Sequence, residues 1–261
     1  MSRLTLDIGG VRSGFLCEKK FYGELCGRYA RFVSAGRPDF LFELGRKVKK
    51  DIPATPRISR ETGRVRFKRG DFDCLLDERT GIGRLNVHPA AQTFDSFLRT
   101  FYSRILLCEG GMLLHCAALL KNGRAYLFPG RSGAGKSTLS RLAAGAGLEV
   151  ISDELNLLRF EKGRFMVYGS PFWGEMRNEG RQGVWPLEKI FIIKKAAGHR
   201  VLNMGPGETL SVLLRCLMNF SKAPEAADAA LANTAELLAA VPVKRLEFSN
   251  RDAGFLDLLQ N

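Results

Sequence analysis

The sequence predicts an α/β protein in which a small β-rich module (residues 1–92) precedes a larger α/β domain (residues 93–261). Three observations lead to this prediction. The first 90 residues alternate apolar and polar positions between frequent turn residues, which is typical of short antiparallel strands. Residues 94–108 then have the apolar spacing of a helix. Finally, an apolar strand at residues 125–128 is followed by a glycine-rich loop and a helix-forming run.

The N-terminal module is predicted to hold five strands and one short helix. The strands are expected at residues 4–8, 40–44, 64–68, 72–76 and 83–87, and the helix at residues 18–30. The pair Gly70-Asp71 separates two of the alternating runs, so the strands at 64–68 and 72–76 are expected to form a hairpin.

The larger domain is predicted to begin with the helix at residues 94–108, which ends at the glycines of residues 109–111. Strands at 112–120 and 124–128 are joined by Lys121-Asn122-Gly123, a strong hairpin signal. Further strands are expected at 148–154, 156–160, 164–168, 190–194 and 243–248, and helices at 138–144, 210–220 and 223–240. The glycine-rich, charged segment 170–183, with Arg177 and Arg181, is expected to be a loop that closes over a bound substrate.

Composition sets limits on the class of protein. A chain of 261 residues with 45% hydrophobic residues can bury a core and is not wholly disordered. No run of 18 apolar residues predicts a transmembrane helix, and Arg3 and Asp7 interrupt the region where a signal sequence would be apolar. The six cysteines include no C-x-x-C pair, which favours reduced, buried thiols over a disulfide or zinc site. We therefore expect a cytoplasmic protein.

The net charge of +13 is concentrated in the N-terminal part, where residues 1–100 hold 20 Lys/Arg against 12 Asp/Glu. The densest basic stretch runs from residue 46 to residue 69. Such a surface attracts polyanions, but few aromatic residues are interleaved for stacking on bases. A solvated basic face or a docking face for an acidic protein partner is therefore favoured over nucleic-acid binding.

The most specific motif lies between the strand at 125–128 and the following helix. Gly130, four further residues and then Gly135-Lys136-Ser137 match the phosphate-binding loop G-x-x-x-x-G-K-[S/T]. The glycines allow backbone N–H groups to turn inward as an anion nest, and the helix adds the positive end of its dipole. Lys136 would bind the outer phosphates and Ser137 would ligate Mg²⁺.

The alternative is a chance glycine-rich turn at a helix start, but the full pattern with its flanking strand and helix favours nucleotide binding. The predicted nucleotide-binding residues are Gly130, Arg131, Ser132, Gly133, Ala134, Gly135, Lys136, Ser137 and Thr138.

Two acids complete the predicted site. Asp153 and Glu154 follow an apolar strand downstream of the loop, where a metal-binding acid of a nucleotide site belongs. If that strand runs parallel to the one before the loop, both sites reach the same sheet edge. The alternative is an ordinary exposed strand end. His115 lies within an apolar strand, where a histidine is more often a core residue than a catalytic one.

The order of these motifs resembles the bacterial HPr kinase/phosphorylase family, and especially its divergent HPr kinase-related branch. The resemblance rests on residues 111–120, the loop at 128–138 and Ile151-Ser-Asp-Glu154, and it covers about residues 93–215. It implies the P-loop fold shared with ATP-dependent phosphoenolpyruvate carboxykinases. It also implies that Asp153 is the catalytic acid/base, Glu154 its neighbouring acid and His115 an active-site histidine, and that the protein is a homo-oligomer.

Together these features predict a kinase that uses ATP and Mg²⁺. Asp153, His115 and Lys136 are its predicted catalytic residues, and Ser137, Asp153 and Glu154 its predicted metal ligands. The predicted acceptor is a serine-type hydroxyl of a protein or peptide. A kinase for a small hydroxyl-bearing molecule and a non-catalytic ATP-binding regulatory module remain alternatives.

Overall fold

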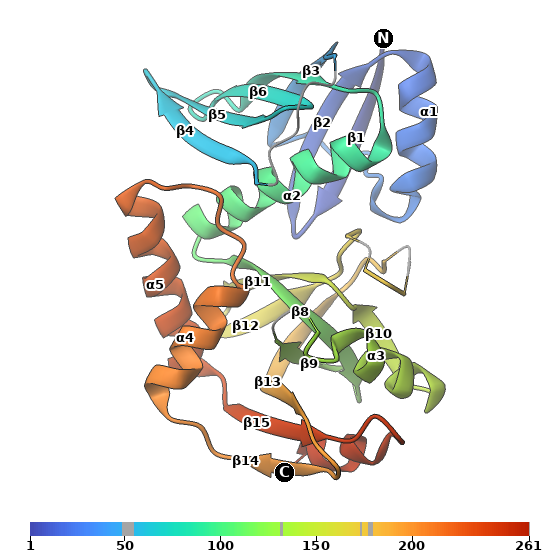
Figure 1. Cartoon of the computed structure of the whole chain (residues 1–261). Helices are drawn as coiled ribbons and strands as arrows, with labels where there is room; N and C mark the ends of the chain where they lie inside the picture. Colours follow the sequence, from blue (N-terminus) through green and yellow to red (C-terminus); the bar gives the residue numbers. More distant parts are fainter. Residues whose placement is uncertain (49–54, 131–132, 173, 177–179, 261) are drawn as a thin grey trace. The chain divides into compact units, whose positions relative to one another are not determined.

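We describe the protein from a computed structural model, in which residues 1–48, 55–130, 133–172, 174–176 and 180–260 are described (Figure 1). The fold is mixed α/β, as predicted, with two sheets. Contacts divide the chain into a first unit, Met1–Ile105 with Asn219–Ala227, and a second unit, Leu106–Met218 with Asp228–Asn261. The boundary lies within helix α2, later in the chain than the boundary at residue 92 inferred from the sequence.

The first unit contains a seven-stranded sheet in the order β1-β2-β3-β7-β6-β5-β4. Its elements are β1 (Ser2–Ile8), β2 (Val11–Cys17), α1 (Lys19–Arg28), a 3-10 turn (Ala30–Phe32), β3 (Phe40–Arg46), β4 (Arg57–Glu61), β5 (Arg64–Arg69), β6 (Phe72–Asp77), β7 (Ile82–Val87) and α2 (Ala91–Cys108). Strand β3 pairs in parallel with β2 and β7, and the other neighbours are antiparallel. The predicted hairpin of β5 and β6 is present.

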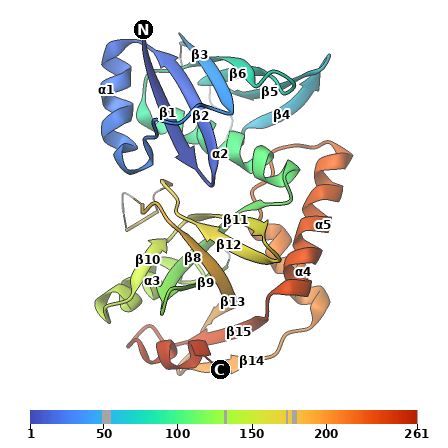
Figure 2. The same cartoon turned by 180° about the vertical axis from the view of Figure 1, so that it is seen from behind.

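The core of the first unit is aromatic. Helix α2 lies along one face of the sheet (Figure 1), and Phe97 and Phe101 contact the rings of Phe42, Phe67 and Phe72. Because α2 carries apolar residues at helical spacing and the strands alternate, one face of each element is buried. Helix α1 lies beside β1, as the view from behind shows (Figure 2).

The second unit is built on an eight-stranded sheet. Its elements are β8 (Met112–Lys121), β9 (Arg124–Pro129), α3 (Lys136–Gly145), β10 (Glu149–Ser152), β11 (Leu155–Glu161), β12 (Arg164–Tyr168), β13 (Val184–Lys195), β14 (Arg200–Leu202), α4 (Pro206–Cys216), α5 (Pro224–Ala240), β15 (Val243–Phe248) and a 3-10 segment (Gly254–Gln260). Strands β8, β11, β12, β13 and β9 pair in turn and close into a ring.

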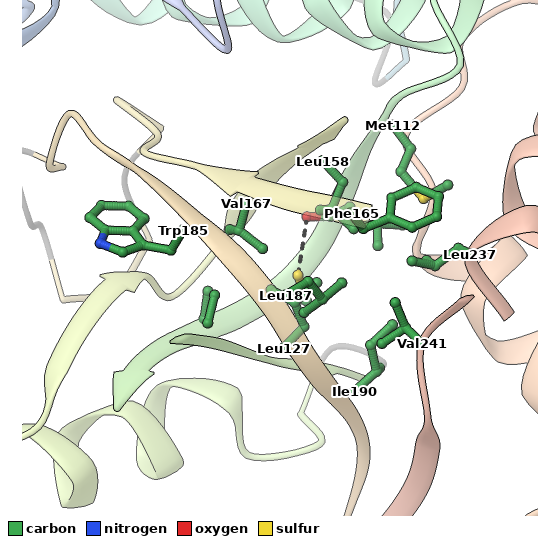
Figure 3. Packing of buried hydrophobic residues seen from close by; sticks show 14 of the residues in the cluster. Met112, Leu127, Leu158, Phe165, Val167, Trp185, Leu187, Ile190, Leu237 and Val241 are labelled. Atoms are coloured by element: carbon green, nitrogen blue, oxygen red, sulfur yellow. Dashed lines mark hydrogen bonds between the residues drawn. The ribbon is translucent and has the colours of Figure 1, made fainter. Parts of the chain in front are cut away.

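The inside of this ring forms one hydrophobic core. Side chains from alternate positions of the strands meet there, among them Met112, Leu127, Phe165 and Leu187 (Figure 3). The opposite face of the strands packs on α3, through residues such as Phe128 and Leu139. Since β8 and β9 are buried on both faces, they read in the sequence as continuous apolar runs.

The structure also shows elements that the sequence did not predict. Strand β2 contains Ser13 and Gly14, and strand β4 has charged residues at three of its five positions, so neither has a clear apolar alternation. Strand β13 begins at Val184, earlier than the predicted 190–194, because Trp185 and Leu187 point into the ring.

The structure shows the state of the cysteines and the character of the helices, for which the composition gave expectations. All six cysteines have free thiols, of which Cys108 is exposed and Cys26 is half-buried. Within the described ranges, no helix has both the length and the apolar character needed to cross a bilayer.

The basic stretch of the first unit lies largely on β4 and β5. Arg66 pairs with Asp73 and Glu61, and Arg69 pairs with Asp71. Lys49 and Lys50 lie outside the described residues. Part of the predicted basic face is therefore neutralised by carboxylates of its own sheet.

Candidate active site

Strand direction brings the two sequence motifs to one edge of the second sheet. Strands β9 and β10 each pair antiparallel with β8, so they run in the same direction. The predicted parallel relation is therefore present, with β8 between the two strands. The glycine-rich loop leaves the end of β9, and Asp153-Glu154 leaves the end of β10. Strand β13, parallel to β9, ends at this edge as well, at Lys195.

The loop after β9 has the backbone geometry that an anion nest needs. Gly133 and Gly135 have φ values of 78° and 106°, which side chains with a Cβ rarely adopt. A Cβ on Gly130 would come within 2.9 Å of the Ala134 Cβ, so the loop is also tightly folded there. Helix α3 begins at Lys136, and its first turn points toward the loop.

Lys136 is a buried cation, only 7% exposed. Its Nζ donates a hydrogen bond to the Gly130 carbonyl oxygen at 3.0 Å. This bond holds the side chain across the loop, where its charge adds to the positive end of the α3 dipole. A bound anion would therefore meet both a full charge and backbone N–H groups.

Asp153 is a buried anion, 4% exposed, at the end of β10. Its Oδ2 accepts a hydrogen bond from the Met176 N–H at 3.1 Å. A Cβ on Gly174 would collide with the Asp153 carboxylate, so glycine is required for the segment to approach this closely. The Glu154 N–H donates to Ser152 Oγ at 3.1 Å, which fixes the turn that carries both acids.

His115 lies in the middle of β8, opposite Leu155 of β11, and its side chain is half-buried. The next residue is held firmly, because Cys116 N–H donates to the Glu154 carbonyl at 2.9 Å and Asn156 Nδ2 donates to the Cys116 carbonyl at 2.7 Å. Burial raises the pKa of the Cys116 thiol, so this residue beside His115 is neutral at neutral pH.

A pocket of about 560 Å³ joins these groups. Its lining residues are His115, Gly133, Gly135, Lys136, Ser137, Thr138, Asp153, Glu154, Gly174, Glu175 and Lys195. The structure thus brings together most of the residues singled out in the sequence. Gly130 and Ala134 of the loop pack close to each other and do not line the pocket, and Arg131 and Ser132 lie outside the described residues.

Three lining residues were missed from the sequence: Gly174, Glu175 and Lys195. Lys195 could have been found, because it ends a core strand that is parallel to the strand before the loop. Gly174 and Glu175 belong to the segment 170–183, which was expected to close over a substrate, but the sequence did not indicate which of its residues approach Asp153.

The glycine-rich segment is closed at its base by a hydrogen bond from the Gly169 N–H to the Gly183 carbonyl at 2.9 Å. Arg181 forms an ion pair with Glu149 and lies over the Trp185 ring, 5.2 Å from its centre. Arg181 therefore anchors the base of the segment. Arg177 lies outside the described residues.

The side chains that line the pocket can be compared with those that usually bind a metal ion. In the described part of the chain, no three His, Cys, Asp or Glu side chains are clustered so that they could hold a metal ion by themselves. Mg²⁺ usually binds to one or two carboxylates together with substrate phosphates and water. Ser137, Asp153 and Glu154, which all line the pocket, fit that mode of binding.

No family model matches the chain, and no curated protein matches its sequence. Among solved structures, the HPr(Ser) kinase/phosphatase from Coxiella burnetii aligns with 57% of this chain and 85% of its own, at 13% identity and a TM-score of 0.29. A similarity of this size does not show membership of a family, so function must be inferred from the pocket itself.

Proposed function

We propose that this protein is an ATP- and Mg²⁺-dependent kinase that transfers the γ-phosphoryl group to a serine-type hydroxyl of a protein or peptide. The observation that carries the proposal is the convergence of Lys136, Ser137, Asp153 and Glu154 in one pocket at the end of β9 and β10. A loop with positive-φ glycines, a helix start and a buried lysine together form a site for phosphates. The buried Asp153 and the half-buried Glu154, which line the same pocket, supply a base and a metal ligand.

In this proposal each residue has a defined task. The loop and Lys136 hold the triphosphate, and Lys136 offsets the charge that develops on the transferred group. Ser137 and one of the acids would hold Mg²⁺, which neutralises phosphate charge when bound. Asp153 accepts the proton of the acceptor hydroxyl, while that oxygen bonds to the γ-phosphorus and the bond to the β-phosphate oxygen breaks to release ADP.

His115 lines the same pocket, and we assign it to hydrogen bonding with the transferred phosphoryl group. The fold we propose for the second unit is the P-loop fold of the HPr kinase and phosphoenolpyruvate carboxykinase type, which the order of histidine, loop and acid pair in the sequence supports. We further propose that the first unit is a docking module for the acceptor or for an acidic partner.

The test is incubation of the purified protein with γ-labelled ATP and Mg²⁺, followed by candidate peptides and small hydroxyl compounds. Label that moves to a serine peptide supports the proposal, whereas label that moves only to a small molecule supports a small-molecule kinase. Tight binding without transfer, unchanged in Asp153→Asn, supports a non-catalytic module. If Lys136→Ala binds ATP as tightly as the wild type, the site assignment itself is wrong.

A further inference from the structure

Lys195 is the last residue of β13, and its position is fixed from both sides. Strand β13 pairs in parallel with β9, which leads into the glycine-rich loop, and with β15, where Lys195 stands opposite Phe248. The following Ala196 N–H donates to the Phe248 carbonyl at 2.9 Å. The backbone that carries Lys195 is therefore held at the edge of the sheet where the pocket opens.

The side chain of Lys195 extends over the loop. Its Cε lies 3.3 Å from the point that a Cβ on Gly135 would occupy, and the Phe248 ring lies 3.0 Å from the same point. Gly135 directly precedes helix α3, so the ammonium group, one bond beyond Cε, lies close to the helix start. Lys195 also lines the pocket that holds Lys136, Ser137 and Asp153.

The neighbouring Lys194, at the same strand end, is held in an ion pair and so provides a comparison for Lys195. Lys194 faces the other side of β13, and its Nζ forms a 3.0 Å ion pair with Glu247. Within the described parts of the chain, Lys195 forms no ion pair with a carboxylate, and the residue is exposed to solvent in the pocket. Its charge is thus available to an anion that enters.

We propose that Lys195 is a second phosphate-binding cation of the nucleotide site, contacting the phosphate chain where it passes over Gly135. This proposal rests on the proposed function, because it requires a nucleotide in the pocket. A nucleoside triphosphate brings several negative charges to a pocket that already contains Asp153, Glu154 and Glu175. One lysine alone leaves that charge poorly balanced, and a second cation in the same pocket reduces the repulsion.

The test compares Lys195→Met with its matched control Lys194→Met. Methionine keeps the apolar stem beside Phe248 and removes only the charge. We expect Lys195→Met to weaken Mg·ATP and Mg·ADP binding by about 10- to 100-fold, the loss typical of one charge-assisted hydrogen bond. Lys195→Arg should recover part of the affinity, and Lys194→Met should bind like the wild type. Binding is measured directly, by calorimetry or with a fluorescent nucleotide.

Two results separate this proposal from the proposed function. If Lys195→Met binds nucleotide within twofold of the wild type while Lys136→Ala loses binding, the role of Lys195 is wrong and the nucleotide site stands. If Lys136→Ala and Lys195→Met both bind like the wild type, the nucleotide site itself is wrong. Thermal unfolding of each variant identifies any loss that comes from misfolding. If Lys195→Met does not fold, Lys195→Gln, which also removes the charge, takes its place with the same expected loss of binding.

Discussion

Buried charges occur in both units of this protein, but they are balanced in different ways. In the first unit, Asp95 accepts hydrogen bonds from Arg28 at 3.0 Å, Arg99 at 2.7 Å and the Tyr29 hydroxyl at 3.1 Å. Arg104, 9% exposed, is paired with Glu78 at 2.8 Å. These charges are neutralised by side chains of opposite sign, as buried charges in a stable core require.

In the second unit, the buried charges of Lys136 and Asp153 both line a pocket of about 560 Å³. Lys136 donates to the Gly130 carbonyl, and Asp153 accepts from the Met176 N–H. The same unit contains Glu247, which is buried and paired with Lys194 and Arg200. We propose that the difference follows the role of each charge: Asp95 and Glu247 stabilise the fold through their ion pairs, and Lys136 and Asp153 serve a ligand of the pocket.

The largest expected effect tests the pocket side of this comparison. Asp153→Asn keeps the shape of the side chain but removes the proposed base. We expect phosphoryl transfer to fall about 1,000-fold, or about 4 kcal/mol in activation free energy, with ATP binding changed less than about threefold. Single-turnover transfer of labelled phosphate and direct binding measure the two quantities. A variant that transfers phosphate at the wild-type rate would show that Asp153 is not the base.

Much of the candidate site could be predicted from the sequence, because the motifs that define it are made of adjacent residues. The loop at residues 130–138, the acid pair and the Asn122-Gly123 hairpin each depend on a few adjacent residues. Asn122 and Gly123 have φ values of 53° and 73°, as the predicted turn requires. Strand direction could also be inferred, since chain order and short connections leave few topologies.

The features that could not be predicted from the sequence depend on contacts between residues far apart in the chain. Strand β4 has one buried residue, Ile58, and is held by its pairing with β5, so its own composition does not predict it. Lys194 and Lys195 are chemically identical neighbours in the sequence. Only the position of Glu247 on one side of β13 and of Gly135 on the other makes one structural and the other a residue of the pocket.

The second largest effect is expected on stability, at the paired buried charge of the first unit. Asp95→Ala leaves Arg28 and Arg99 without their carboxylate in a largely buried position. We expect the free energy of unfolding to fall by about 3 kcal/mol, the cost typical of breaking a buried pair. Chemical denaturation followed by circular dichroism measures this change. A loss below about 1 kcal/mol would place Asp95 with ordinary surface ion pairs.

The matched change at the pocket should have a much smaller effect on stability. Lys136→Met removes a buried cation that we propose binds a ligand, and it also removes the hydrogen bond to the Gly130 carbonyl. If the ligand role is the main one, the free energy of unfolding without nucleotide should change by no more than about 1 kcal/mol. ATP should raise the melting temperature of the wild type and should fail to raise that of the variant. Strong destabilisation of Lys136→Met without nucleotide would mean that Lys136 is a structural charge.

The smallest effect concerns a paired carboxylate nearer the surface. Hydrogen bonds from the Arg66 guanidinium at 2.8 Å hold the pKa of Asp73 below its ordinary value, against the opposing effect of burial. The folded unit therefore binds fewer protons here than the unfolded chain, so this stabilisation is present above the unfolded pKa of about 3.9 and is lost as the pH falls through the lower folded value. Asp73→Asn should lower the melting temperature by on the order of 2 °C at pH 7. That difference should shrink as the pH falls below about 4, and a difference that is constant from pH 7 to pH 2.5 would exclude the charge of Asp73 as its source.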